Sequence, residues 1–126
     1  MFVLMRCLHK ARQGAARDEH RPAHRAWVAS GGNGLVSVLV GSAILTESGE
    51  TAGNFGILEA RSLEDARKFA EGDAFNLAGI VETIELTPLP DTFQAHRITD
   101  PMSPRLETAG ESRRPGSSPA ERGRCR

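Results

Sequence analysis

Residues 35–45 read LVSVLVGSAIL, a nearly continuous apolar run that is rich in β-branched side chains. Such side chains pack well on a pleated surface, so the run predicts a β-strand. A glycine inside a strand is typical of a bulge or of another group in close approach, and we expect one of these at Gly41. Turn-forming residues occupy 46–51, so residues 52–60 should return antiparallel as the second strand of a hairpin.

A helix is expected before this hairpin. Pro22 suits the first position of a helix, because its ring holds φ near the helical value and it has no N–H to lose. Arg21 is then the last residue before the helix, and Trp27 is its large core anchor. The helix should stop at residues 30–34, a Ser-Gly-Gly-Asn-Gly cluster that tolerates positive φ.

A second helix is expected after the hairpin, and a strand at each end of the domain. The Ser62–Asp65 segment resembles a capping box, and Gly72 ends the helix that it begins. Residues 73–76 should form a short connection. Residues 2–8 and 80–88 have the apolar pattern of strands. The element order is therefore β-α-β-β-α-β, which predicts an α+β fold of the ferredoxin-like type.

The same sheet predicts self-association. Two helices on one face of a four-stranded sheet leave the other face uncovered, and the strands at 2–8 and 35–45 are apolar on both sides. We expect that face to be buried against a second copy, so the sequence predicts a homodimer.

The composition changes after the last strand. Residues 1–90 should form the folded α+β domain, and residues 91–106 an extended C-terminal arm of mixed polarity. Residues 107–126 are rich in Arg, Gly, Ser and Pro without any apolar period, which predicts a disordered tail.

Length and charge exclude several classes of protein. A chain of 126 residues with 39% apolar residues fits one globular domain. Lys and Arg together number 16, as do Asp and Glu, so no overall field favours binding to nucleic acid. No apolar run approaches the roughly 20 residues of a membrane helix, and no signal peptide is recognisable, so the expected location is cytoplasmic. Cys7 and Cys125 lie far apart without metal-ligand spacing, so we expect two free thiols, no metal and no cofactor.

His24 is the residue with the strongest chemical signal. In the first turn of the predicted helix, the positive end of the helix dipole disfavours the imidazolium, so the ring should stay neutral and accept protons near pH 7. The alternative is that His24 only caps the turn or lies in solvent.

The sequence also resembles the YciI-like (YCII-related) family of the dimeric α+β barrel superfamily, over residues 1–90. The resemblance is carried, in the expected order, by RPAH at 21–24, VGSAIL at 40–45 with SGE at 48–50, SLEDARKFA at 62–70, DAF at 73–75 and AG at 78–79. It implies dimers whose sheets enclose a pocket, and a dyad formed by His24 and Asp73. The prolines usual in the family after the aspartate and after the strand glycine are replaced by Ala74 and Ser42.

This resemblance implies an enzyme that transfers protons. Asp73 would accept a hydrogen bond from one ring nitrogen of His24 while the other nitrogen exchanges a proton with a small-molecule substrate. Gly41, Ser42 and Phe75 would line the substrate pocket. Such a dyad suits isomerisation, elimination or dehydrohalogenation of a small cyclic or aromatic acid.

Two other functions stay open. A non-catalytic dimeric small-molecule-binding or interaction module would use His24 only to contact its ligand. A haem or oxygen enzyme of the same superfamily fold ranks last, because His9, His20 and His96 form no ligand pattern with His24.

Overall fold

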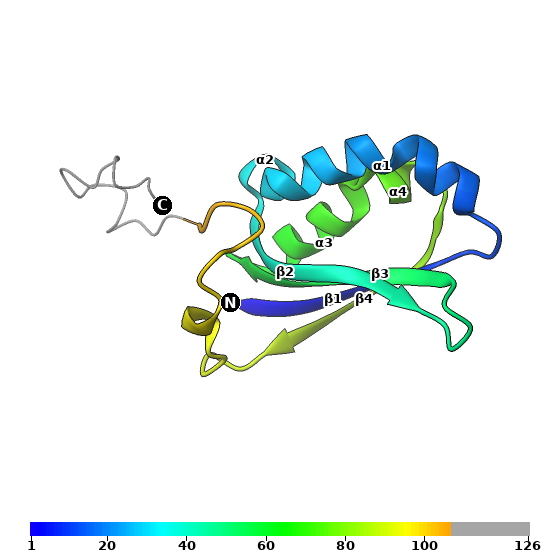
Figure 1. Ribbon diagram of the computed structural model, residues 1–126. Coiled ribbons are helices and arrows are strands. Elements are labelled where there is room, and N and C mark those ends of the chain that lie inside the picture. Colours follow the sequence, from blue (N-terminus) through cyan, green and yellow to red (C-terminus); the bar gives the residue numbers. More distant parts are fainter. Residues whose placement is uncertain (107–126) are drawn as a thin grey trace.

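The computed structural model of the protein describes residues 1–106 and places the main helices on one face of a single sheet (Figure 1). The elements in chain order are β1 (Phe2–His9), α1 (Gly14–Ala29), α2 (Gly31–Gly34), β2 (Val36–Leu45), β3 (Thr51–Ala60), α3 (Leu63–Gly72), α4 (Ala74–Leu77), β4 (Val81–Leu89) and a 3-10 turn at Ala95–Arg97. Within this part of the chain, no helix is both long and apolar enough to cross a membrane. The cytoplasmic location stays a prediction. The predicted disordered tail and Cys125 lie outside the described residues.

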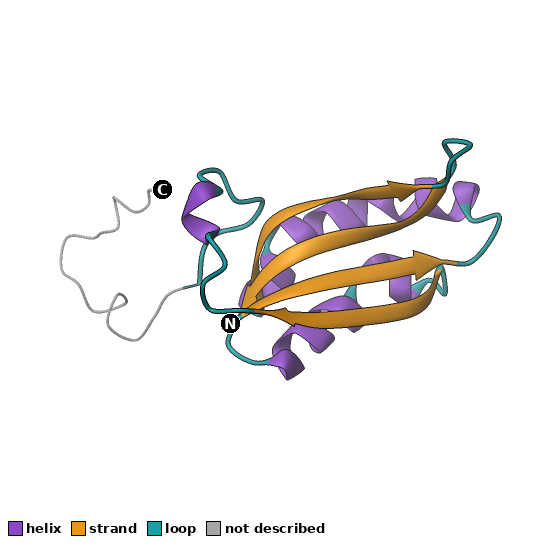
Figure 2. Ribbon diagram, turned by 90° about the horizontal axis from the view of Figure 1, so that it is seen from below, coloured by secondary structure: helices purple, strands orange, loops and turns teal. Residues whose placement is uncertain are grey.

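The sheet has four antiparallel strands in the order β2-β3-β1-β4. β1 lies in the middle, between β3 and β4, and the β2–β3 hairpin occupies one side. Figure 2 shows the opposite face of the sheet free of helices. The predicted β-α-β-β-α-β order and the α+β fold class are confirmed.

The core fills the space between the sheet and the helices. Alternate residues of β1 point to the helices and are buried, namely Val3, Met5 and Cys7. They share one apolar cluster with Leu58 of β3 and Phe69 of α3. Every second residue of the central strand therefore contributes to the core, as a strand period of two requires.

Trp27 anchors α1 to α3, as the sequence predicts. Its indole N–H donates to the Phe69 carbonyl oxygen at 2.9 Å, and the two rings stack with their centroids 6.0 Å apart. A Cβ at Gly72 would lie 2.8 Å from Trp27 Cζ2, and a Cβ at Gly32 would lie 3.0 Å from the same atom. The absence of a side chain at both glycines therefore sets how closely the indole and the neighbouring backbone can approach.

The bulge of the β2–β3 hairpin lies just before Gly41. The strand register shifts between Val38 and Val40, so Leu39 is the extra residue. Gly41 shows the other feature that a strand glycine indicates, because a Cβ there would lie 2.9 Å from the Phe55 carbonyl oxygen. A larger residue at Gly41 would push the two strands apart.

The start of the first helix differs from the prediction. α1 begins at Gly14 with Gln13 as its N-cap, so Pro22 lies inside the helix and not at its first position. The prediction that Arg21 precedes the helix is wrong. His24 consequently lies well beyond the first turn, where the field of the helix N-terminus has fallen off. The helix dipole does not explain how this histidine would be held neutral.

Packing explains why the helix extends through the proline. Pro22 removes the bond that its own N–H would make to the carbonyl of Asp18, and because Asp18 is exposed, water can hydrogen-bond that carbonyl instead. The half-buried residues of the longer helix recur at helical spacing on the side that faces the sheet, and they include Ala16, His20, His24, Trp27 and Val28.

Residues 74–77 also differ from the prediction. They form the short helix α4, where the sequence predicted a plain connection. Asp73 is the N-cap of this helix, and its Oδ2 accepts the N–H of Phe75 at 3.2 Å. The Asp73 side chain is therefore the N-cap that marks the start of α4, and the prediction of a plain connection did not take it into account.

The segment that follows the 3-10 turn contacts β2 through the backbone and side chain of Ser103. The N–H of Val38 donates to Ser103 Oγ at 2.6 Å, and the N–H of Ser103 donates to the Val38 carbonyl oxygen at 3.1 Å. Ser103 is only 3% exposed. These bonds satisfy backbone groups on an edge strand of the sheet, which would otherwise face solvent.

Replacing Pro22 with alanine should stabilise the protein, because alanine restores the missing N–H and removes the clash of the ring with the preceding turn. A proline in a helix interior costs about 3 kcal/mol relative to alanine. We expect the free energy of unfolding in urea to rise by about 1–3 kcal/mol. Pro88→Ala, in the edge strand β4, is the control and should change stability little. Unchanged stability in Pro22→Ala would indicate a proline at the start of a helix.

Candidate active site

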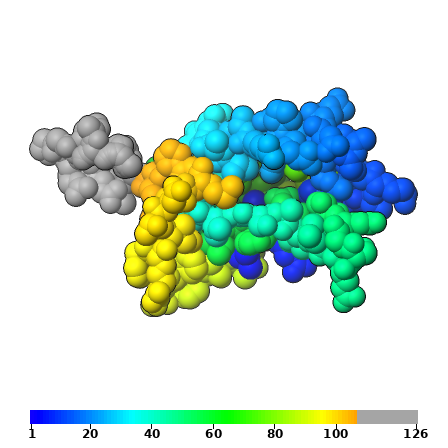
Figure 3. Space-filling view, viewed as in Figure 1, coloured from blue at the N-terminus to red at the C-terminus, as the bar shows by residue number. Residues whose placement is uncertain are grey.

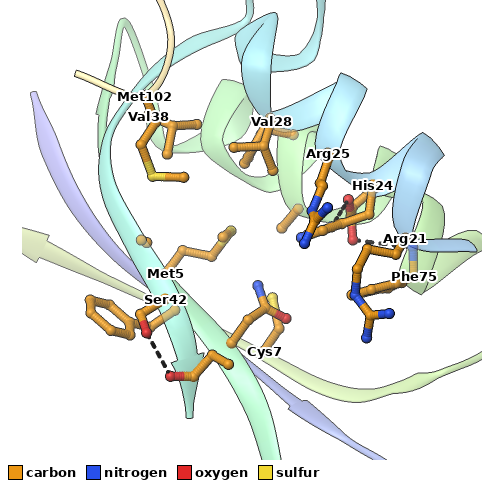
Figure 4. Close-up of a pocket in the computed structure, with 18 of the residues that line it drawn as sticks. Met5, Cys7, Arg21, His24, Arg25, Val28, Val38, Ser42, Phe75 and Met102 are labelled. Carbon is orange, nitrogen blue, oxygen red and sulfur yellow. Dashed lines mark hydrogen bonds and ion pairs between the residues drawn. The ribbon is translucent and has the colours of Figure 1, made fainter. Parts of the chain in front are cut away.

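A cavity of about 490 Å³ lies between α1 and the sheet. The space-filling view shows the surface hollowed between α1, in blue, and the β2–β3 hairpin, in cyan to green (Figure 3). A cavity of this size is typical of a small-molecule site. Its apolar lining comes from several elements and includes Met5, Cys7, Val28, Val38 and Met102, as Figure 4 shows.

His24 and Asp73 form a hydrogen-bonded pair at the wall of this cavity. The distance from His24 Nδ1 to Asp73 Oδ1 is 2.7 Å, and the two side chains are 19% and 12% exposed. Because an ionised carboxylate only accepts, Nδ1 carries the hydrogen. The other nitrogen, Nε2, has no hydrogen-bond partner among residues 1–106. A neutral His24 therefore presents a lone pair on Nε2.

The Asp73 carboxylate is held by both of its oxygens. Oδ2 accepts the N–H of Phe75 at the start of α4, while Oδ1 accepts from His24. Ala74 replaces the proline that is usual in the family, which leaves the backbone after Asp73 with more conformational freedom. The N-cap bond supplies the restraint that the proline would have supplied through its ring.

Phe75 stacks on His24. The two ring centroids are 4.1 Å apart and the planes differ by 5°. On the same phenyl ring, His9 makes an edge contact at 5.6 Å with an interplanar angle of 82°. Phe75 is buried, so it separates two histidine rings and limits the rotation of His24.

His9 is a second histidine of the cavity, and both of its ring nitrogens have partners. A guanidinium only donates, so Nδ1 accepts from Arg17 at 3.1 Å, and Nε2 then donates to Asn54 Oδ1 at 2.9 Å. Burial lowers the pKa of His9, the bond to Asn54 opposes this, and the charge of Arg17 lowers the pKa further. His9 is therefore neutral near pH 7.

Cys7 contributes a thiol to the floor of the cavity. Burial raises its pKa to about 12, and the negative charge of Asp73 acts in the same direction. The reactive form of a cysteine is the thiolate. Cys7 therefore behaves as an apolar lining group near neutral pH.

The structure brings all five predicted site residues to one cavity, namely Gly41, Ser42, His24, Asp73 and Phe75. Ser42 Oγ donates to the carbonyl oxygen of Ala43 at 2.9 Å, so its hydroxyl hydrogen is used within the strand. The catalytic and binding roles of the five residues stay predictions.

Sequence reasoning missed the polar groups at the α1 end of the cavity. His9, Asn54 and Arg17 come from a strand end, from the middle of β3 and from a part of α1 that was not expected to be helical. Only the four-residue spacing of Arg17, Arg21 and Arg25 was visible in the sequence, and it becomes a signal once the helix is known to start at Gly14. Within residues 1–106, no group of three or more His, Cys, Asp or Glu residues is arranged to hold a metal ion.

The fold and this cavity define a class of protein. The chain is an antiparallel β-α-β-β-α-β domain of the α+β class, with its main helices on one face of the sheet and a His–Asp pair beneath the first helix. The model of the YCII-related domain matches residues 1–90, so the chain belongs to the YCII-related family. The family identified from the sequence motifs is thereby confirmed.

A solved structure with the same fold matches with a TM-score of 0.60 and 23% sequence identity, and the match covers 71% of this chain and 94% of the other. The other protein is 5-chloro-2-hydroxyhydroquinone dehydrochlorinase (TftG) from Burkholderia phenoliruptrix AC1100, in complex with 2,5-dihydroxybenzoquinone. At this identity the likeness shows the fold alone. A search of curated proteins found no match.

The lowered pKa of His9 predicts a loss of stability in acid. Below the ordinary value of 6.5, the unfolded chain binds a proton that the folded protein resists, so the free energy of unfolding should fall as the pH drops. His9→Gln should reduce this acid loss, because glutamine can still accept from Arg17 and donate to Asn54. Urea unfolding above and below this pH measures the effect. His20→Gln, outside the cavity, is the control, and an equal acid loss in His9→Gln and wild type would contradict the prediction.

Proposed function

We propose that the protein is an enzyme that transfers protons on a small cyclic or aromatic acid, of the isomerase, lyase or dehydrochlorinase type. His24 is the general base, and Asp73 orients it. The observation that carries this proposal is the 2.7 Å bond from His24 Nδ1 to Asp73 Oδ1 at a cavity wall, with Nε2 left without a partner among residues 1–106. A base within reach of substrate is the first requirement of such chemistry.

Other groups that line the cavity are poorer candidates for the base. Both ring nitrogens of His9 are hydrogen-bonded, and its pKa is lowered mainly by burial. Cys7 keeps its proton because its pKa is raised to about 12. In the part of the chain that the structure describes, His24 Nε2 is therefore the cavity nitrogen with a free lone pair.

The reaction step needs only this base. His24 Nε2 takes a proton from a carbon next to a carbonyl group, and the electron pair of the broken C–H bond forms a new double bond. In an elimination, chloride leaves with its bonding electrons, so the substrate loses one proton and one chloride ion. In an isomerisation, the imidazolium returns its proton to a different carbon. Asp73 accepts a hydrogen bond from the imidazolium while the proton is in transit.

Phe75 stabilises His24 when the histidine is protonated during the proposed reaction. Its ring lies parallel to that of His24 at 4.1 Å. An aromatic face within about 6 Å of a cation stabilises it by about 0.5–2 kcal/mol. Gly41 and Ser42 belong to the opposite wall in this proposal, where they limit the size of the substrate.

Two observations support the proposal that the substrate contains a ring. The cavity of about 490 Å³ has apolar lining from Met5 and Val38, which suits a flat ring. The structural match is named a dehydrochlorinase and holds 2,5-dihydroxybenzoquinone, a six-membered ring. We extend this class of ligand to the present chain as part of the proposal.

His24→Ala should abolish turnover while leaving folding intact. A positioned general base contributes about 10²- to 10⁴-fold to a rate, so the loss should be of that order. Chloride release from 2-chloro-4-oxocyclohexanecarboxylate and exchange of substrate hydrogens with deuterated water, followed by NMR, report the two reaction types. The melting temperature of the variant provides the control for folding.

Asp73→Asn should reduce the rate less than His24→Ala, because the amide still holds the ring but no longer favours the reactive tautomer. The double variant should be no slower than His24→Ala alone, as expected of residues that act as a unit. An unfolded His24→Ala variant would show a structural histidine. Ligand binding that weakens in His24→Ala, with no reaction on any cyclic acid tested, would favour the non-catalytic binding module.

We also propose that the protein is a homodimer that pairs through the helix-free face of the sheet (Figure 2). Leu4 and Leu8 alternate with the buried residues of β1 and so point to that face, and Ile57 is the direct neighbour of Leu4 on β3. All three are half-buried in the single chain. Arg6 lies between Leu4 and Leu8 on the same face and pairs with Glu85 at 3.5 Å. A face with partly exposed leucines and an ion pair at its centre is typical of an interface between copies, which combines apolar and charged contacts.

Light scattering should find two chains in each particle of the wild-type protein and one chain in Leu4→Glu, because a buried carboxylate at the interface costs more than the pairing contributes. Lys68→Glu, on the exposed side of α3, is the control and should stay dimeric. A wild-type monomer at micromolar concentration would rule out the proposed pairing.

A further inference from the structure

α1 carries three arginines on the face that covers the cavity. Arg17, Arg21 and Arg25 follow one another at intervals of four residues, so they lie on one side of the helix and about 6 Å apart along its axis. All three line the cavity. In Figure 4, Arg21 and Arg25 point from α1 into the space above the strands, on the same side as His24.

These arginines make the cavity electropositive. Among the described residues that line it, Asp73 is the single carboxylate, and Asp73 is paired with His24. Arg17 donates to His9, which is neutral, so this contact does not compensate the charge of Arg17. Like charges four residues apart on a helix also destabilise it by about 0.2–0.5 kcal/mol per pair. An anion bound beneath α1 would neutralise part of the positive charge of the cavity and would also reduce the repulsion between the arginines.

Arg21 and Arg25 are available to bind such an anion. Arg21 pairs with Asp18 at 2.7 Å, but the Asp18 side chain is 76% exposed. An exposed ion pair contributes about 0–1 kcal/mol, so a ligand can replace Asp18 at small cost. The side chain of Arg25 makes no hydrogen bond and no ion pair with any of residues 1–106, although it lines the cavity.

We infer that Arg21 and Arg25 form an anion subsite in the roof of the cavity, and that the ligand is a small mono-acid whose carboxylate these two guanidinium groups bind. The inference rests on the proposed function, because it names the part of the substrate that α1 recognises. A guanidinium presents parallel N–H groups that match the two oxygens of a carboxylate.

The floor of the cavity suits the remainder of such a ligand. Met5, Cys7 and Val38 present apolar surface there, and burial of a second charged group against them would be costly. This favours a mono-acid over a polyphosphate. Because Arg21 lies three residues before His24, the two side chains are neighbours on the face of α1 that lines the cavity, and a carboxylate held in the roof would place the ring of the ligand next to His24 (Figure 4).

The test compares acids with their uncharged amides, so that no turnover is needed. Benzoate, salicylate and cyclohex-1-enecarboxylate are titrated against benzamide, salicylamide and cyclohex-1-enecarboxamide by ligand-observed NMR. The wild-type protein should bind each acid about 10-fold or more tightly than its amide, since hydrogen bonds to charged groups contribute about 1.5–3 kcal/mol. Added salt should reduce this preference.

The variants separate the subsite from general electrostatic attraction. Arg21→Gln and Arg25→Gln should each remove most of the preference for the acid, and Arg25→Lys should keep part of it, because lysine retains the charge but not the planar fork. Arg67→Gln is the matched control, since Arg67 is an exposed arginine of α3 that pairs with Glu71. It should leave the preference unchanged.

Equal preference for acids in wild type, Arg21→Gln and Arg25→Gln overturns the subsite. Failure of all three acids to bind the wild-type protein at millimolar concentration overturns it too. A preference for the acids that Arg21→Gln and Arg25→Gln lose and Arg67→Gln keeps supports the subsite even if no turnover is ever found, in which case the proposed enzyme activity fails separately.

Discussion

The contact between Trp27 and Gly72 is the constraint on which the candidate site depends. Trp27 lies about one turn after His24 on α1, and Gly72 directly precedes Asp73 at the end of α3. A Cβ at residue 72 would lie 2.8 Å from the indole ring, so a larger residue would force α1 and α3 apart. The hydrogen bond of 2.7 Å between His24 and Asp73 does not survive a displacement of even 1 Å. The glycine therefore sets the geometry of the dyad without touching it.

The parts of the fold that the sequence predicts well are those with strong local signals. The hairpin follows from β-branched residues and a turn, and α3 begins where Ser62 Oγ accepts the N–H of Asp65 at 3.1 Å. The start of α1 was missed because the preference of proline for a first helical position is only statistical, and here it opposes packing. The stripe that extends α1 back to Gly14 includes Ala16 and His20, whose modest hydropathy hides an amphipathic face.

The candidate site was predictable only in part. His24 and Asp73 were identified from family motifs, whereas the physical reason first assigned to His24, the field of a helix N-terminus, does not apply inside α1. His9 and Asn54 are 45 residues apart and meet because β1 pairs with β3. No local pattern carries that information, since strand register depends on the whole sheet.

One carboxylate influences two neighbouring groups of the cavity in opposite ways. Asp73 accepts the Nδ1 hydrogen of His24, which leaves a lone pair on Nε2 and provides a counter-charge for the imidazolium once it forms. The same negative charge disfavours the thiolate of Cys7, adding to the larger effect of burial. A thiol with a pKa of about 12 does not compete as a nucleophile near neutral pH. In the reaction that we propose, the ring of the substrate would therefore meet a base at His24 and an unreactive sulfur at Cys7.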